Sequence, residues 1–310
     1  MNLTRREALL APLALATIGA AEAKPAIIDT HTHFYDPTRP EGVPWPGKGD
    51  KVLYRPVLPA EFKKLAAPHG VTGTVVVEAS SRVEDNQWLL DLAKDEPFLV
   101  GIVGRLAPDD AKFQTHLERF AKNPLFRGIR WNEAETRAAL KNAEQFRRLQ
   151  ALSDAGLTLD LNGGPEVHHA AATVAEKFPK LRIVVNHMGN PRLDGMPPVE
   201  AWKKAIVASA AARKNVWCKL SALVDGTGKT DRKAPTDAAY YKSTFDPLWE
   251  AFGADRLIFG SNWPVSDLYA SYATVFDLAA GFVKPKGDTA FAKVFGANAM
   301  AAYQLERRMR

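Results

Sequence analysis

Two histidines near the start of the chain carry the clearest chemical signal. His31 and His33 follow a short apolar run and stand two residues apart in the segment Ile27-Ile28-Asp29-Thr30-His31-Thr32-His33-Phe34. Alternate side chains of a β-strand share a face, so both imidazoles would converge on one ion or one substrate. Imidazole is a common ligand of zinc, nickel, iron and copper. The spacing predicts a site at a strand end, against the simpler interpretation of two polar residues without a ligand.

Short apolar runs alternate with helical patterns along the chain, and their number indicates the architecture. Eight β-then-α units favour parallel strands joined by crossover helices and closed into a (β/α)8 TIM barrel, in the α/β class. A Pro- and Gly-rich loop is expected at 36–58. The strands are expected at 26–34, 73–78, 98–106, 128–132, 158–162, 182–187, 216–220 and 257–260, and the helices at 86–95, 111–122, 143–155, 166–178, 199–213, 238–252 and 289–309.

Further polar residues fall at the carboxyl ends of the expected strands, where the catalytic groups of a TIM barrel lie. Glu78 ends the second strand, Arg130 lies on the fourth and His187 ends the sixth. Lys219 lies on the seventh strand and Asn262 follows the eighth. Each of these residues alone is more often structural than functional. Their joint occurrence at equivalent places predicts one pocket at this end of the barrel.

The first 23 residues read as an export signal rather than as part of the fold. Arg5-Arg6 precede an apolar stretch at 8–20 and an Ala21-Glu22-Ala23 cleavage pattern, a combination similar to twin-arginine signals. The apolar stretch falls short of the roughly 18 to 20 residues that a spanning helix needs. We therefore expect one barrel domain over residues 24–310, located in the periplasm and free of the membrane once the signal is removed.

Composition restricts the partners. The chain has a formal net charge of +6, but its basic residues are scattered and form no tract, so we expect no nucleic-acid partner. The expected partner is a small molecule, anionic or sugar-like. Cys218 is the single cysteine, so no intramolecular disulfide can form and stability must come from the core.

Five segments occur together in this chain: 28–34, 127–130, 187–191, 219–221 and 259–265. In this order and at these spacings they resemble the amidohydrolase-related proteins, in the branch known as amidohydrolase 2. That branch includes sugar lactonases such as fuconolactonase, pyrone-dicarboxylate lactonase and, more distantly, zinc-dependent decarboxylases. The resemblance covers essentially the whole chain after the signal, and it implies a distorted (β/α)8 barrel.

The resemblance also implies roles for particular residues. His31 and His33 match the strand-one metal ligands of the superfamily. His187 matches a strand-six histidine that serves as a ligand or as an acid or electrophile toward the substrate. Arg130 matches an arginine that, in lactonases of this branch, is placed to bind a carboxylate or carbonyl oxygen, which suits a guanidinium. The implied cofactor is a divalent metal held by His31, His33 and His187, with zinc first among the candidates and a metal-independent site as the alternative.

Asn262 departs from the family pattern, which usually has aspartate in Gly-Ser-Asp-Trp-Pro. An amide cannot take a proton near neutral pH, so the simplest hydrolytic mechanism lacks its base. We consider Glu78 and Asp267 as replacements, although Asp267 is also explained as a helix N-cap, with Ser266 as competitor. The strand-five histidine of the zinc decarboxylases is absent from the stretch Leu159-Asp160-Leu161-Asn162.

Taken together, the sequence predicts a hydrolase that opens a lactone or similar cyclic ester, sugar-derived or carboxylated. Lys219 and Asn262 are expected to bind the substrate. Trp45, Trp131 and Trp263 are expected to wall the pocket, as aromatic rings suit a sugar or ring-shaped ligand. Two alternatives stay open: a non-catalytic periplasmic carbohydrate-binding barrel and a zinc-dependent decarboxylase.

Overall fold

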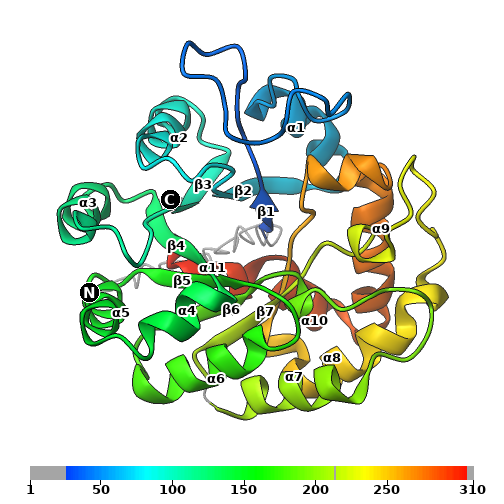
Figure 1. Cartoon of the computed structure of the whole chain (residues 1–310). Coiled ribbons are helices and arrows are strands. Elements are labelled where there is room, and N and C mark those ends of the chain that lie inside the picture. The colour runs from blue at the N-terminus through cyan, green and yellow to red at the C-terminus, as the bar shows by residue number, and fades with distance from the viewer. Residues whose placement is uncertain (1–25, 213, 306–310) are drawn as a thin grey trace, which may run out of the picture.

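A computed structural model describes residues 26–212 and 214–305 of the chain. Eight parallel strands pair in chain order from β1 to β8, with helices between them around the outside (Figure 1). The predicted (β/α)8 TIM barrel is therefore confirmed. None of the described helices is both long and apolar enough to cross a membrane. The predicted export signal, residues 1–23, lies outside the described residues.

All eight predicted strands are present. β5 and β7 have the predicted bounds, and the other strands differ from their predicted bounds by one or two residues at one or both ends. The predicted sixth strand is too long, because the chain turns into a left-handed conformation at His187, two residues after β6 ends. The strands are β1 Ile27–Thr32, β2 Val71–Val77, β3 Leu99–Gly104, β4 Phe126–Asn132, β5 Thr158–Asn162, β6 Arg182–Val185, β7 Val216–Leu220 and β8 Leu257–Phe259.

The helices form the outer layer. α1, α4 and α9 were not predicted, and the expected terminal helix is broken into α10, a π-helical turn at Lys293–Ala297 and α11. Gly296 permits this turn to pack beneath β1, since a Cβ there would lie 2.1 Å from the Ala26 carbonyl oxygen. The helices are α1 Pro59–Ala66, α2 Glu84–Lys94, α3 Phe113–Ala121, α4 Glu133–Ala139, α5 Ala143–Asp154, α6 Val167–Lys177, α7 Glu200–Ala212, α8 Lys242–Arg256, α9 Tyr272–Val283, α10 Asp288–Ala292 and α11 Asn298–Tyr303.

The amino-terminal end of the barrel is closed by α11, which packs against the apolar side chains inside the barrel (Figure 1). The Ala302 carbonyl accepts hydrogen bonds from Thr158 Oγ1 at 2.7 Å and Arg182 Nε at 3.0 Å, at the first residues of β5 and β6. This plug leaves the carboxyl-terminal end as the open end of the barrel, where the predicted pocket lies.

The barrel closes at a seam between β1 and β8 that differs from the regular pairs. A single parallel bridge joins Thr32 to Trp263 among the described residues. The His33 amide donates to the Trp263 carbonyl at 2.9 Å, and the Asn262 amide donates to the His31 carbonyl at 2.8 Å. These bonds bring the histidines of strand one beside Asn262, although 229 residues separate His33 from Asn262 in the sequence.

Asp29 reinforces the seam with its side chain. Its Oδ1 accepts from the Ser261 amide at 2.9 Å and the His31 amide at 3.0 Å, and the Tyr272 hydroxyl lies 3.3 Å from Oδ2. Burial raises the pKa of this carboxyl to about 6, while the hydrogen bonds act in the opposite direction. One buried carboxylate thus ties β1 to the segment that follows β8.

Candidate active site

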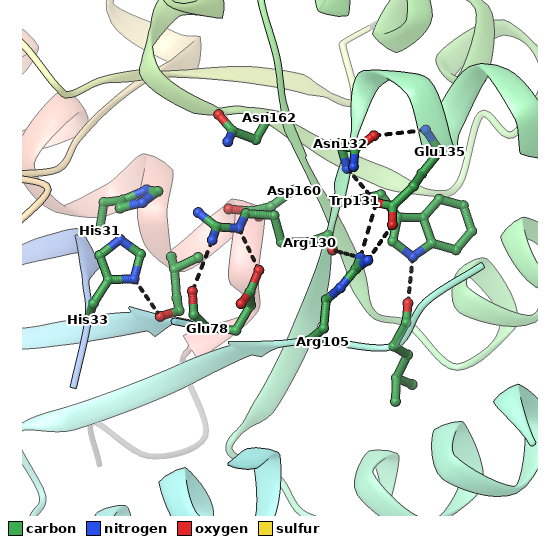
Figure 2. Close-up of polar contacts among 12 residues, drawn as sticks. His31, His33, Glu78, Arg105, Arg130, Trp131, Asn132, Glu135, Asp160 and Asn162 are labelled. Atoms are coloured by element: carbon green, nitrogen blue, oxygen red, sulfur yellow. Dashed lines mark hydrogen bonds and ion pairs between the residues drawn. The ribbon is translucent and has the colours of Figure 1, made fainter. Parts of the chain in front are cut away.

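A cavity of about 480 Å³ opens at the carboxyl ends of the strands. Six of the predicted site residues line it, namely His33, Trp45, Glu78, Arg130, His187 and Asn262. His31 is fully buried beside them, with its ring centre 4.3 Å from that of His187 and 5.0 Å from that of His33. Figure 2 shows His31 and His33 next to each other on β1, facing the Arg130 and Glu78 pair. The structure thus confirms one pocket built from several strand ends.

The proton on His33 is placed by a backbone carbonyl. Its Nδ1 lies 2.9 Å from the Val77 oxygen, which can only accept, so Nδ1 carries the hydrogen and Nε2 keeps its lone pair (Figure 2). Burial, with a further contribution from Arg130, lowers the pKa of His33 to about 3. The imidazole is therefore neutral near pH 7, with a bare Nε2.

Asn262 faces that bare nitrogen with an oxygen. Its Nδ2 donates to Asp225 Oδ1 at 2.7 Å, which leaves Oδ1 at 3.3 Å from His33 Nε2. The backbone at Asn262 is left-handed, with φ of 63°, a conformation that asparagine tolerates better than most residues. Two hydrogen-bond acceptors, His33 Nε2 and Asn262 Oδ1, therefore lie side by side at the pocket, where one ligand with two hydrogens can donate to both. We call them the acceptor pair.

Lys219 determines the proton on His31. Its ammonium lies 2.8 Å from the Thr30 carbonyl oxygen, 2.7 Å from Asp160 Oδ2 and 3.3 Å from His31 Nδ1, and it is fully buried. Three N–H groups meet three acceptors, so His31 Nδ1 accepts and its Nε2 carries the hydrogen. That Nε2 is buried and has no hydrogen-bond partner among the residues described. A buried N–H without a partner is costly, which marks it as a group meant for a ligand.

His187 sits on a strained turn. His187, Met188, Gly189 and Asn190 all have positive φ, and strain of this kind is found at functional sites. Ser221 Oγ accepts from the His187 amide at 3.3 Å and lies 2.9 Å from its Nδ1. When the Ser221 hydroxyl donates its hydrogen to His187 Nδ1, the imidazole of His187 carries its own hydrogen on Nε2. Burial, then Arg130 and Lys219, lowers the pKa of His187 well below its usual value.

Arg130 and Glu78 form an ion pair at the pocket wall. Arg130 Nε lies 2.9 Å from Glu78 Oε1, and Nη2 donates to the Glu78 carbonyl oxygen at 3.0 Å (Figure 2). Burial raises the pKa of Glu78, although Arg130 opposes that shift. The pairing neutralises most of the positive charge of Arg130. It also holds the Glu78 carboxylate on the arginine, so that its first role is to orient the guanidinium.

Four predicted site residues lie away from the cavity. Lys219 lies beneath it, as described above. Trp131 and Trp263 are fully buried in the core: the Trp131 indole donates to the Leu106 carbonyl at 2.7 Å, and Trp263 packs 5.2 Å from the ring of Phe62. Of the three predicted tryptophans, Trp45 alone walls the pocket, 6.1 Å from the His33 ring.

Asp267 is the fourth, and it is not brought to the pocket. It lies in the short 3-10 helix Val265–Leu268, with Oδ2 4.0 Å from Arg55. It is not an N-cap either, because Pro264 occupies that position and no side-chain cap is formed. The structure thus favours neither role that the sequence suggested for Asp267.

Two residues that support the site were not predicted from the sequence. Asp225 follows β7 by five residues and contacts Asn262 from behind, and burial raises its pKa to about 7. No motif marks it; the one available signal is an aspartate on the loop after a barrel strand. Tyr303 of α11 donates to both oxygens of Asp160, at 2.9 and 3.0 Å, and so completes the buried partner of Lys219. It could not be foreseen because α11 comes from the far end of the chain.

The donor set does not fit a resident metal ion. In neutral His31 and His187 the Nε2 atoms carry hydrogens, which leaves His33 Nε2 as the one bare nitrogen of the three predicted ligands. Across the described part of the chain, no group of three or more His, Cys, Asp or Glu side chains is arranged to hold a metal. The ammonium of Lys219 and the guanidinium of Arg130 further oppose a dication. The set His31, His33 and His187 stays a prediction, and no step below passes through an ion.

Comparisons with known proteins find relatives over nearly the whole chain. A protein-family profile described as amidohydrolase matches residues 28–305. An L-fucono-1,5-lactonase of Burkholderia ambifaria is 31% identical over 289 residues, covering 90% of this chain and 96% of that protein. An L-fucono-1,5-lactonase of Burkholderia multivorans is 29% identical over 291 residues, with the same coverage of 90% and 96%. A crystal structure of an amidohydrolase from B. multivorans with bound zinc has a TM-score of 0.79 at 28% identity, covering 90% and 99%.

Proposed function

This chain belongs to the amidohydrolase 2 family, and from that premise we propose that it is a hydrolase that opens the ring of a sugar-derived lactone. The observation that carries the proposal is the acceptor pair, His33 Nε2 and Asn262 Oδ1, 3.3 Å apart in the pocket. A water molecule has two hydrogens to donate, so the pair is suited to bind the attacking water. The imidazole of His187, which lines the same cavity, supplies an N–H donor for the lactone carbonyl.

The attack begins at that water. Its oxygen adds to the carbonyl carbon of the lactone while one hydrogen passes to His33 Nε2, which acts as the general base. The low pKa of about 3 makes His33 a weak base before the reaction starts. Negative charge develops on the carbonyl oxygen during attack, and this charge opposes the effect of Arg130 and raises the proton affinity of the imidazole. The step therefore suits an activated ester such as a lactone better than an amide.

The tetrahedral intermediate is stabilised by fixed donors. The Nε2–H group of His187 and the guanidinium of Arg130 both line the cavity and are available to the carbonyl oxygen, where pre-organised donors lower the barrier by stabilising the developing negative charge. When the intermediate collapses, the bond from the carbonyl carbon to the ring oxygen breaks. The leaving ring oxygen takes the proton held by His33, so the product is one open-chain hydroxy acid and the site returns to its initial state.

The charges of the pocket favour a neutral substrate over a carboxylated one. The guanidinium of Arg130 is already paired with Glu78, and the ammonium of Lys219 is buried with Asp160. Neither offers a free cation to a substrate carboxylate. Ser80 and Ser81 add hydroxyl groups to the lining. Together with the Trp45 ring they suit a hydroxylated ring, whose polar edges and apolar face match such a wall.

A lactone panel tests this function. The purified protein is assayed by acid release on L-fucono-1,5-lactone, on other five- and six-membered sugar lactones and on 2-pyrone-4,6-dicarboxylate. We expect turnover of sugar lactones and none of the dicarboxylate. Tight binding of a sugar lactone without turnover would instead favour the carbohydrate-binding barrel. Carbon dioxide release from an acidic substrate would favour the decarboxylase, and either result contradicts the proposal.

Substitution of Arg130 tests the mechanism within that panel. Arg130→Gln removes a charged donor from the developing oxyanion, so kcat is expected to fall by about 10²-fold or more, with a smaller change in KM. The control is Arg119→Gln, which removes an arginine that is also paired with a glutamate, Glu84, but lies on the surface. An unchanged kcat in Arg130→Gln would show that this arginine does not act on the transition state.

A further inference from the structure

We propose that Asp225 is a positioning residue that holds the Asn262 amide so that its oxygen faces His33. The proposal concerns the chemistry that replaces the aspartate usual at position 262. Its kinetic test rests on the proposed lactone hydrolysis, whereas its spectroscopic test does not.

The contacts of Asp225 point to this single role. It opens the short 3-10 helix Asp225–Thr227, and its Oδ1 accepts from Asn262 Nδ2 at 2.7 Å. Its Oδ2 is buried and has no hydrogen-bond partner among the residues that the structure describes. A buried carboxylate oxygen left without a donor is costly. Among the described residues, the side-chain hydrogen-bond partner of Asp225 is thus the Asn262 amide of the pocket.

The orientation of that amide decides whether His33 is free to act. A carboxylate can only accept, so Asp225 forces Nδ2 of Asn262 toward itself and leaves Oδ1 facing His33. With a group at position 225 that donates, the amide turns by half a rotation. Its NH2 then donates to His33 Nε2 and occupies the lone pair that would take the proton of water.

Protonation of Asp225 has the same effect as that substitution, since a carboxylic acid donates. The titratable groups near this carboxyl are Tyr241, on the 3-10 helix before α8, and Tyr269, after the 3-10 helix that follows β8. Burial raises the pKa of both phenols, and the charge of Asp225 adds to the shift. Both phenols are neutral near pH 7 and leave Asp225 as the titrating group there. Activity is therefore expected to fall on the acid side as Asp225 takes up a proton.

Three variants and one control test the pair kinetically. Asp225→Asn replaces a group that can only accept by an amide that can also donate, so Asn262 is no longer held in one orientation. This substitution is expected to lower kcat by about 10- to 100-fold, as is typical when a residue supporting a site is lost, with little change in KM. The exchange Asp225→Asn with Asn262→Asp restores one carboxylate and one amide to the hydrogen bond, so it should recover much of kcat. Asn262→Asp alone sets two carboxylates 2.7 Å apart and should raise the apparent pKa of the acid limb. The control Asp110→Asn changes a half-buried carboxylate paired with His116, away from the pocket.

Nitrogen NMR of histidine-labelled protein tests the same orientation without any substrate. In the native protein the His33 Nε2 resonance should be that of a bare nitrogen, and in Asp225→Asn it should move upfield as the Asn262 amide donates to it. If the native protein opens no lactone, the proposed function fails while this measurement still tests the pair. Unchanged kcat, pH profile and His33 resonance in Asp225→Asn would overturn the proposal. Should Asp225→Asn fail to fold, the exchanged variant decides, because a purely structural role predicts no recovery of kcat.

Discussion

Two of the three imidazoles in this pocket, those of His33 and His31, have their protons placed by a neighbour that has a single hydrogen-bonding role. The Val77 carbonyl can only accept, and so puts a hydrogen on His33 Nδ1. Lys219 can only donate, and so puts the hydrogen of His31 on Nε2. The result is one base and one donor from two residues of the same type. The sequence predicts the histidines but not these roles, because Lys219 lies 188 residues from His31.

Strand geometry also explains which site residues were predicted wrongly. Arg130 and Trp131 are adjacent on β4, so their side chains point to opposite faces. Arg130 lines the cavity, while Trp131 packs 6.3 Å from the ring of Phe113 on the helix side. In the segment 259–265, Asn262 lines the cavity, whereas the neighbouring Trp263 is buried in the core.

At this scale the metal prediction can be decided by removal. Because Lys219 donates to His31 Nδ1, the opposite nitrogen carries a hydrogen and is no ligand. Dialysis against EDTA is therefore expected to leave kcat on a sugar lactone unchanged, with the metal content followed by mass spectrometry. Loss of activity with EDTA and its return with zinc would contradict this expectation. It would show that the three histidines bind the ion and that Lys219 does not fix the hydrogen of His31 on Nε2.

At the scale of elements, buried parallel strands were predictable and short helices were not. Strands such as β3 and β8 are continuous apolar runs with both faces covered, a pattern that few other elements share. α4 was missed because Glu133–Ala139 has almost no apolar stripe; it begins instead at a capping box between Asn132 and Glu135. The break of the terminal helix at Gly296 depends on contact with Ala26, which no local pattern reveals.

The long loop between β1 and α1 brings Trp45 to the pocket. Arg39 anchors this loop to α2 through an ion pair with Asp85 at 2.9 Å and by lying 4.5 Å over the Trp88 ring. A bridge between Tyr35 and Val57 joins its two ends. The loop is therefore an ordered wall, although its Pro- and Gly-rich composition alone predicts only a loop.

Trp45→Ala is expected to weaken substrate binding more than chemistry. An aromatic contact contributes roughly 0.5 to 1.5 kcal/mol beyond its buried area, which corresponds to a rise in KM of about 2- to 10-fold. kcat should change less, because Trp45 makes no contact with the reacting atoms. Trp45→Phe keeps an aromatic face and serves as the matched control. Equal KM values for Trp45→Ala and the native protein on a sugar lactone would exclude the ring from binding.

At the scale of the whole molecule, buried histidines make the fold sensitive to acid. Burial lowers the pKa of His33 to about 3 and of His168 to about 4, and it lowers those of His31 and His187 well below the usual value. The unfolded chain takes up these protons near pH 6.5, so the four histidines stabilise the fold above that pH and lose this effect as pH falls. Asp29 and Asp225 have raised pKa values of about 6 and about 7, so their effect has the opposite sign and is lost as pH rises.

On unfolding, the four histidines take up protons as pH falls, whereas the buried carboxyls with raised pKa values release them. The pH dependence of the free energy of unfolding is the difference between these opposite contributions, and each histidine contributes to a fall in stability toward acid pH. Thermal unfolding measured across pH gives the slope of this dependence. His168→Gln, in a buried position on α6, should reduce the slope by one proton, whereas His169→Gln, exposed on the same helix, should leave it unchanged. Equal slopes in both variants would contradict the assignment.

The seam between β1 and β8 links the lifetime of the pocket to the opening of the barrel. Seven neighbouring strand pairs form parallel ladders, whereas the eighth junction depends on the backbone amides of His33 and Asn262 and on Asp29. Those two amides belong to the residues whose side chains form the acceptor pair. Local opening of the seam therefore disassembles the water site before any other strand pair separates. The rate of hydrogen exchange at these two amides therefore measures how often the site comes apart.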